Sequence, residues 1–150
     1  GVTHHYFALN ALQNKYSDLE VIGVPCNQFG MQEQGRNGTE ILNSLKYVRP
    51  GGGFVPNFMM LEKLEVNGVN EHPLYTYLKS QCPPTSHSFA SVERLFYKPL
   101  KVSDVRWNFE KFLINSQGMP VLRYSSQFHS DDITDDIKHL LMEPWYTKTD

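Results

Sequence analysis

The sequence has little cysteine and no histidine spacing typical of a metal site. Its two cysteines, Cys26 and Cys82, are too few for a disulfide framework and make no metal site on their own. The six histidines are scattered, and only His4 and His5 are adjacent. Neighbouring residues on a helix point in different directions, so this pair does not favour a shared metal ion. We therefore expect no metal site.

An excess of positive charge and a long apolar run are also missing. The formal net charge is −2 and the pI is near 6.3, which gives no electrostatic basis for binding nucleic acid or an anionic membrane. No window approaches the roughly 18 apolar residues of a membrane-spanning helix. What is present, 150 residues with 13% aromatics, is enough for one domain, residues 1–150, with its own core.

Hydrophobic periodicity predicts alternating helices and strands. Helices are expected over residues 3–16, 40–48, 72–81 and 130–141, and strands over 19–24, 58–66, up to 114 and over 120–124. The turn at 115–118 predicts that the last two strands form an antiparallel hairpin. This order is that of a thioredoxin-like α/β domain, in which helices flank a central mixed sheet.

The opening helix has no strand before it, which is unusual in an α/β domain and indicates that an N-terminal strand is missing. The first residue is Gly1 rather than Met, and no signal peptide or targeting segment is visible. We therefore interpret the sequence as a fragment or a processed chain.

Apolar spacing assigns an inward face to three of the predicted helices. The residues expected on these faces are Ile41, Leu42, Leu45 and Val48, then Leu74, Tyr77 and Leu78, and finally Ile133, Ile137, Leu140 and Leu141.

Residues 24–30 stand at the end of a predicted buried strand, where α/β proteins collect their chemistry. A proline, two amides and a glycine follow the apolar run, so we expect the chain to leave the sheet there and expose Asn27 and Gln28. Cys26 lies between them and the strand. It is interpreted either as a buried structural thiol, which we favour, or as a redox-active one.

The loop over residues 49–57 contains three glycines and two prolines and cannot continue the helix before it. Its apolar Phe54 and Val55 need something to pack against. The loop is either a connector that folds back on its own domain or a contact between subunits. It lacks the spacing and the lysine of a phosphate-binding loop.

Three longer motifs resemble the glutathione peroxidase family. They read VPCNQFG at residues 24–30, KYVRPGGGF at 46–54 and RWNFEKF at 106–112. The opening GVT at 1–3 and LNALQ at 9–13 match the segment that follows the family's peroxidatic residue. The resemblance extends from Gly1 to about residue 141.

The resemblance implies how the chemistry is arranged. In the family a selenocysteine or cysteine attacks the peroxide bond, and side-chain N–H groups stabilise its anion. By motif position these groups are Gln28, Trp107 and Asn108. The family places the peroxidatic residue immediately before Gly1, so the sequence does not contain it. An upstream selenocysteine codon interpreted as a stop is one explanation.

The resemblance also implies the reductant, glutathione, used as a co-substrate with no bound cofactor. Basic side chains hold its carboxylates in the tetrameric branch of the family. Arg49 and Arg123 match such groups, and Arg36 matches one that reaches in from a neighbouring subunit. Leu122, Ser126 and Gln127 stand where cytosolic members carry further arginines, so weaker glutathione binding or another reductant stays open.

The RPGGG loop resembles the assembly loop of that branch, which implies a homotetramer. The segment CPPTS at residues 82–86 and the acceptor tripeptide Asn37-Gly38-Thr39 are similar to secreted plasma and epididymal members. They favour an extracellular protein, whereas His72-Pro73-Leu74 favours a cytoplasmic one. No cysteine stands in the helix after the assembly-loop region, where thioredoxin-dependent members keep their resolving residue, which disfavours a thioredoxin-coupled cycle.

Two functions are consistent with these sequence features. The first is an enzyme that reduces hydrogen peroxide and organic hydroperoxides with glutathione. The second is a non-catalytic thioredoxin-like protein that binds glutathione or a partner, or serves a structural role. The joint presence of Gln28, Trp107 and Asn108 favours the enzyme.

Overall fold

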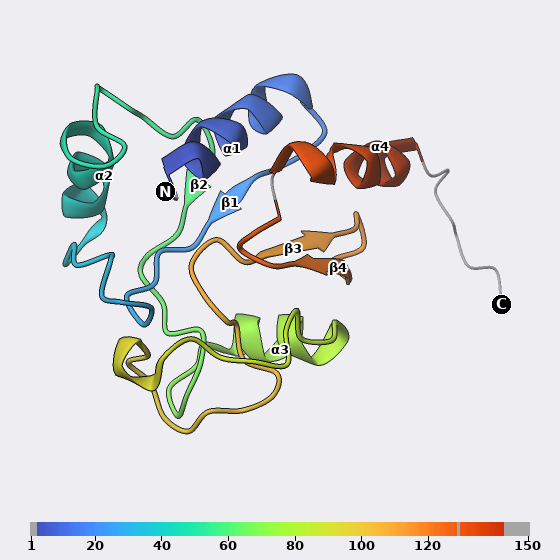
Figure 1. Cartoon of the computed structure of the whole chain (residues 1–150). Helices are drawn as coiled ribbons and strands as arrows, with labels where there is room; N and C mark the ends of the chain where they lie inside the picture. The colour runs from blue at the N-terminus through green and yellow to red at the C-terminus, as the bar shows by residue number, and fades with distance from the viewer. Residues whose placement is uncertain (1–2, 129, 143–150) are drawn as a thin grey trace, which may run out of the picture.

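The computed structural model describes residues 3–128 and 130–142 of the chain (Figure 1). The helices and strands follow in the order α1 (Thr3–Lys15), β1 (Ile22–Gly23), α2 (Gly38–Tyr47), β2 (Met59–Met60), α3 (Pro73–Gln81), η1 (Val92–Arg94), β3 (Lys111–Ile114), β4 (Pro120–Tyr124), η2 (Ser130–Ile133) and α4 (Thr134–Met142). All four helices and the late hairpin lie where the periodicity predicts them.

The strands form two small sheets. β1 and β2 are parallel, with Ile22 opposite Met59. β3 and β4 are antiparallel, with Lys111 opposite Tyr124, as the hairpin prediction required. Among the described residues the two sheets do not pair with each other, so the single central mixed sheet that we predicted is divided into two halves.

Both strands of the first sheet are shorter than predicted because side chains take up the neighbouring backbone groups. The Gln13 amide donates to the Leu19 carbonyl over 2.6 Å and accepts from the Val21 amide over 2.8 Å. These two groups are therefore bonded to α1 rather than to a strand. Ile22 is 51% exposed, so the prediction of a fully buried strand was wrong for this residue.

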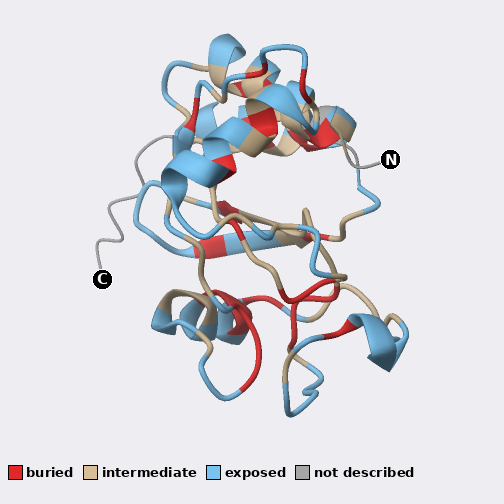
Figure 2. Ribbon diagram, turned by 90° about the vertical axis from the view of Figure 1, so that its left-hand side faces the viewer, coloured by how far each residue is buried: buried red, intermediate tan, exposed pale blue. Residues whose placement is uncertain are grey.

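Helices cover the sheets from both sides (Figure 1). α1 and α4 pack on one side, in a core cluster formed by Leu12, Leu113, Tyr124, Ile133 and Ile137. α3 lies on the opposite side. Figure 2 shows buried residues in the helices and also in the long loops on the side of α3. Those loops form the second core cluster, which consists of Phe29, Val66, Leu95 and Val105.

Several residues predicted on the inward faces are exposed. Tyr77 is 43% exposed because its hydroxyl reaches the surface and donates to the Gly118 carbonyl over 3.0 Å. Val48 is 76% exposed because α2 ends before it. Leu42 and Leu141, at 44% and 40% exposure, also face solvent, whereas Ile41, Leu45, Ile133 and Ile137 are buried as predicted.

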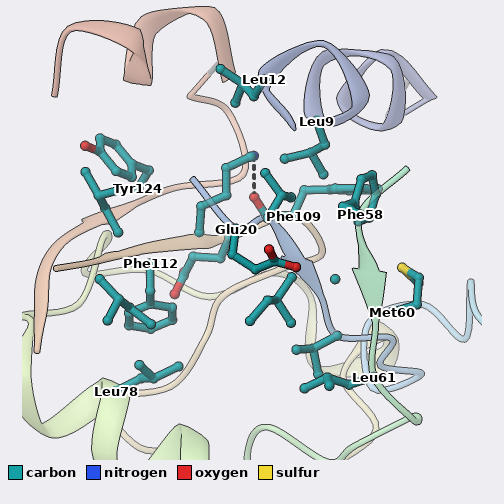
Figure 3. Close-up of a pocket in the computed structure, with 18 of the residues that line it drawn as sticks. Leu9, Leu12, Glu20, Phe58, Met60, Leu61, Leu78, Phe109, Phe112 and Tyr124 are labelled. Carbon is teal, nitrogen blue, oxygen red and sulfur yellow. Dashed lines mark hydrogen bonds between the residues drawn. The ribbon is translucent and has the colours of Figure 1, made fainter. Parts of the chain in front are cut away.

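A cavity of about 380 Å³ lies between the two sheets (Figure 3). Leu9 and Leu12 of α1 border it on one side, and Leu78 of α3 borders it on the other. Most of its remaining lining is apolar and comes from both sheets. The volume is more than twice that of the roughly 150 Å³ cavities that hold benzene. The two sheets are therefore separated by a large, mainly apolar space that is partly open to solvent.

Within the described ranges, no helix has the length and apolar character needed to cross a membrane.

Candidate active site

Two of the motifs that are distant in sequence meet in the structure. The Asn108 amide donates to the Phe29 carbonyl over 3.2 Å, across 79 positions of the chain. The Trp107 ring lies 5.7 Å from the Phe29 ring, measured between centroids. Trp107 and Asn108 are thus held directly beside the residue that follows Gln28.

Gln28 is buried rather than exposed, with 4% of its surface accessible, so the prediction that it is exposed at the strand end was wrong. Its side-chain oxygen accepts from the backbone amides of Val66 and Asn67 over 3.0 and 3.1 Å. Its amino group donates to the Asn67 carbonyl over 2.9 Å. These bonds also replace regular strand pairing at the end of the predicted strand 58–66. The amide of Gln28 is therefore bonded to backbone groups in the interior.

Cys26 has the surroundings of a structural thiol. Its sulfur donates to the Gln28 side-chain oxygen over 3.4 Å. Burial raises the pKa of the Cys26 thiol, although hydrogen bonds to its neighbours act in the opposite direction. A thiol that stays protonated is a weak nucleophile. The structure supports the interpretation of Cys26 that we favoured.

The backbone next to Asn108 is strained. Phe109 has a φ of 64°, which is unfavourable for an aromatic residue. Its ring is held by stacking on His5, at 4.6 Å between centroids, and by an edge contact with Tyr6 at 4.9 Å. The amino group of Lys111 donates to the Phe109 carbonyl over 2.7 Å and lies 3.1 Å from His5 Nδ1. The start of α1 is therefore packed against Phe109, the residue that follows Asn108.

Arg49 shares a small pocket with Asn108. The pocket has a volume of about 70 Å³ and also includes Tyr6, Glu33 and Phe109. Arg49 is exposed. Its guanidinium can therefore reach a negatively charged ligand that approaches Asn108.

Arg123 has different surroundings. Its side chain is 1% exposed and forms an ion pair with Glu110, with 2.7 Å between Nε and the carboxylate oxygen. Further bonds run to the carbonyls of Cys82, Ser103 and Asp104. The guanidinium is thus saturated by internal partners. In this arrangement it offers nothing to the carboxylates of glutathione.

Arg36 lies on the surface ahead of α2. Its backbone amide donates to Glu40, and Asn37 caps the helix by accepting from the Glu40 amide over 3.0 Å. Among the described residues, no hydrogen bond or ion pair joins Arg36 to another predicted site residue. Asn37 is exposed, as an acceptor for glycosylation must be.

A buried polar network beneath the site was not predicted. Asn67 is 0% exposed, and its side chain bonds the backbone of Val105 in both directions. Lys79 donates to Asn67 and also forms ion pairs with Glu71 and Asp104. In the sequence, Asn67 stands directly before Gly68, a pair that is typical of a turn. Nothing local indicates that the turn folds into the interior.

Within the described part of the chain, no three His, Cys, Asp or Glu side chains are grouped as a metal ion requires. The residues predicted for the site instead carry amide, indole and guanidinium groups. Such groups stabilise an anion without titrating near neutral pH.

The chain is similar in structure and in sequence to known proteins. The chain resembles the crystal structure of Trgpx in its apo form, with a TM-score of 0.64 and 30% identity over 96% of this chain and 74% of that one. This likeness confirms the thioredoxin-like α/β fold.

Among curated proteins, glutathione peroxidase 3 of Sapajus apella is 53% identical over 139 residues, which are 91% of this chain. Glutathione peroxidase 6 of Rattus norvegicus is 52% identical over 143 residues. The chain spans 61% and 64% of the length of these two relatives. The family model described as glutathione peroxidase matches residues 1–79, which is more than half of the chain. Together with the shared motifs, these matches show that the chain belongs to the glutathione peroxidase family.

Proposed function

We propose that this protein reduces hydrogen peroxide and organic hydroperoxides at the expense of glutathione. The observation that carries the proposal is the hydrogen bond between Asn108 and Phe29, because it joins the two motifs that supply the N–H donors. Membership of the glutathione peroxidase family supports the same reaction class.

The proposed nucleophile is a selenocysteine or cysteine immediately ahead of Gly1. We further propose that the segment before it is an extended strand that fills the cavity between the sheets. β1 and β3 each have one edge without a partner strand among the described residues, and residues of both strands line this cavity. An apolar strand placed there would pair with both edges and complete one sheet. It would lead directly into α1.

In the proposed reaction the selenolate or thiolate attacks one peroxide oxygen, and the O–O bond breaks. The other oxygen leaves as water or an alcohol after it takes a proton. The oxidised nucleophile, a selenenic or sulfenic acid, then condenses with one glutathione and releases water. A second glutathione attacks that mixed adduct, and glutathione disulfide is released with the nucleophile restored.

The proposed donors to the anionic nucleophile are the Trp107 indole N–H, the Asn108 amide and the Gln28 amide. Asn108 shares a pocket with Tyr6 of α1, and its amino group now donates to the Phe29 carbonyl and to the Gln32 side-chain oxygen over 3.2 and 3.3 Å. The Gln28 amino group now donates to the Asn67 carbonyl over 2.9 Å and to a Glu65 carboxylate oxygen over 3.5 Å, so Gln28 contributes only if it leaves one of these acceptors. Each donor that acts on the transition state contributes roughly 10² to 10³ in rate.

Arg49 is the proposed contact for a glutathione carboxylate within the chain, since it is exposed in the pocket that contains Asn108. Arg36 is proposed to serve a neighbouring subunit. Arg123, although it matches the motif position, is proposed to act only if its ion pair with Glu110 opens.

Assembly as a homotetramer is proposed through the loop after α2. Val48 and Val55 flank its three glycines and are 76% and 61% exposed. An apolar pair on a surface loop is typical of a subunit contact. Replacing Val55 with Asp would then lower the mass measured by light scattering. An extracellular location is proposed from the segment CPPTS, the exposed Asn37 and the relatives named glutathione peroxidase 3.

The proposed function is tested with a chain extended by an apolar strand and a Cys or selenocysteine ahead of Gly1. We expect peroxide-dependent oxidation of glutathione, which Asn108→Ala and Trp107→Phe lower by about 10² or more. Gln34→Ala, an exposed amide bonded only to a nearby carbonyl, is the matched control and should leave the rate unchanged. A folded, extended protein without peroxide-dependent thiol oxidation would overturn the proposal.

A further inference from the structure

Arg94 holds a positive charge against the face of Trp107. Its guanidinium carbon lies 4.6 Å from the centroid of the indole ring. The side chain is exposed. Within the described part of the chain, its guanidinium nitrogens have no hydrogen bond and no ion pair. The structure thus contains an unneutralised cation on a residue of the candidate active site.

The backbone fixes this position. Gly30 donates to the Arg94 carbonyl over 2.8 Å, and Phe96 donates to the Gln28 carbonyl over 2.9 Å. Phe29 and Leu95 form an isolated antiparallel bridge between the same two segments. Arg94 is therefore attached to the motif that contains Gln28, although it comes from η1, more than sixty positions later in the chain.

Gly30 makes the approach of Arg94 to Trp107 sterically feasible. Its φ is 66°, and a Cβ at this position would lie 3.3 Å from both the Arg94 guanidinium and the Trp107 ring. A side chain here would separate the two groups. The glycine is thus required both by the backbone conformation and by the contact between Arg94 and Trp107.

A guanidinium stacked on an aromatic face keeps the N–H groups at its edge free to bind a carboxylate in a bidentate manner. Arg94 and Arg49 then supply one cation next to Trp107 and one next to Asn108. Glutathione carries two carboxylates. We propose that Arg94 is a carboxylate-binding residue for the glutathione reductant, and this inference rests on the proposed function.

The test measures binding of S-methylglutathione to the full 150-residue chain, because this probe keeps both carboxylates but undergoes no thiol exchange. Calorimetry gives the affinity, and the NMR signal of the Trp107 indole N–H reports where the probe binds. We expect Arg94→Ala to weaken binding by about fivefold to tenfold, and Arg94→Lys to weaken it less. Lys15→Ala, on the exposed face of α1, is the control and should bind as the parent does.

Esterification of the carboxylates of the probe should remove the difference between the parent chain and Arg94→Ala. Equal affinity of parent and Arg94→Ala for the unmodified probe would overturn the inference and leave the proposed function intact. Absence of any binding to the parent would overturn both this site and glutathione as the reductant. Thermal unfolding of Arg94→Ala near the parent midpoint confirms that the variant is folded.

The peroxidase assay separates the two proposals in a second way. In the extended, active chain, Arg94→Ala should raise KM for glutathione while kcat at saturating glutathione stays unchanged. A fall in kcat at unchanged KM would contradict a binding role for Arg94. Complete inactivity of the extended parent would instead contradict the proposed function.

Discussion

The Asn67 side chain and the backbone of Val105 exchange two hydrogen bonds. Asn67 Nδ2 donates to the Val105 carbonyl over 2.8 Å, and the Val105 amide donates to Asn67 Oδ1 over 2.9 Å. The pair joins the turn that holds Gln28 to the segment that leads into Trp107. These bonds therefore help to position both the Gln28 segment and the Trp107–Asn108 segment.

Replacement of Asn67 by Ala should destabilise the fold. The change leaves both backbone groups of Val105 without their buried partner and removes one of the acceptors of the Lys79 amino group. We expect the free energy of unfolding to fall by about 2–4 kcal/mol, because several buried polar groups lose their bonds at once. Urea denaturation measures the loss. Asn70→Ala, at an exposed position nearby, should change the stability by less than about 0.5 kcal/mol.

The ion pair between Arg123 and Glu110 should show the energetics of a buried pair. Both side chains are 1% exposed. Arg123→Met removes the cation and leaves the carboxylate buried, which should cost about 3–5 kcal/mol. Adding Glu110→Gln removes the unpaired charge but keeps an acceptor for Thr85 and for the Arg106 amide. The double variant should therefore be more stable than Arg123→Met in the same urea titration, and a double variant that is less stable would contradict this account.

Lys111 should make stability depend on pH in the alkaline range. Burial lowers the pKa of Lys111 from 10.5 to about 8 in the folded chain. Between pH 8 and 10.5 the unfolded chain then holds one more proton at this site, so the contribution of Lys111 to stability rises with pH. Below pH 8 the full penalty of burying the charged amine is present.

We therefore expect the stability difference between Lys111→Met and the parent to shift in favour of the parent as pH rises from 8 to 10.5. Burial also raises the pKa of Tyr6, to about 12, and that of Cys26. Both groups are present in the variant and in the parent, so their contributions cancel in the stability difference. Lys138→Met, at an exposed position of α4, should show no such slope. A flat difference for Lys111→Met would show that its amine is not desolvated.

Gly30→Ala should destabilise the fold by about 1–2 kcal/mol, because a φ of 66° is unfavourable for a residue with a Cβ. The added methyl group should also displace Arg94 from the Trp107 ring, which a shift of the indole N–H signal would detect. Gly38→Ala is the matched control, since nothing lies within 4 Å of its Cβ position. It should be neutral or slightly stabilising. Equal stability losses for the two variants would argue against the steric explanation.

Local features were predictable from sequence, and those that depend on distant partners were not. The hairpin of β3 and β4 was correct because a turn between two apolar segments determines their pairing. The strands over 19–24 and 58–66 were predicted too long because the side chains of Gln13 and Gln28 take their backbone hydrogen bonds. No local pattern identifies a side chain that replaces a neighbouring strand.

The candidate site likewise has features that were predictable from the sequence and features that were not. The motifs indicated Gln28, Trp107 and Asn108 as a group, and the structure brings the segments of all three together. The burial of the Gln28 amide depends on Asn67, which lies 39 positions away. The burial of Arg123 depends on a carboxylate from the adjacent strand segment and on three carbonyls from other loops. Because an isolated arginine is expected at the surface, the sequence position of Arg123 suggested that its side chain binds a ligand and did not indicate that it is buried.

The sequence by itself determined the family, the order of helices and strands and the identity of the motifs, because these follow from residue order and local periodicity. Only the tertiary structure decided where each polar group of those motifs is directed. It turns Gln28 and Arg123 inward, leaves Arg49 and Arg94 exposed beside Asn108 and Trp107, and separates the two sheets by an apolar cavity. The physical reason is that a buried polar group must find its hydrogen-bond partners wherever the fold places them, and those partners are distant in sequence.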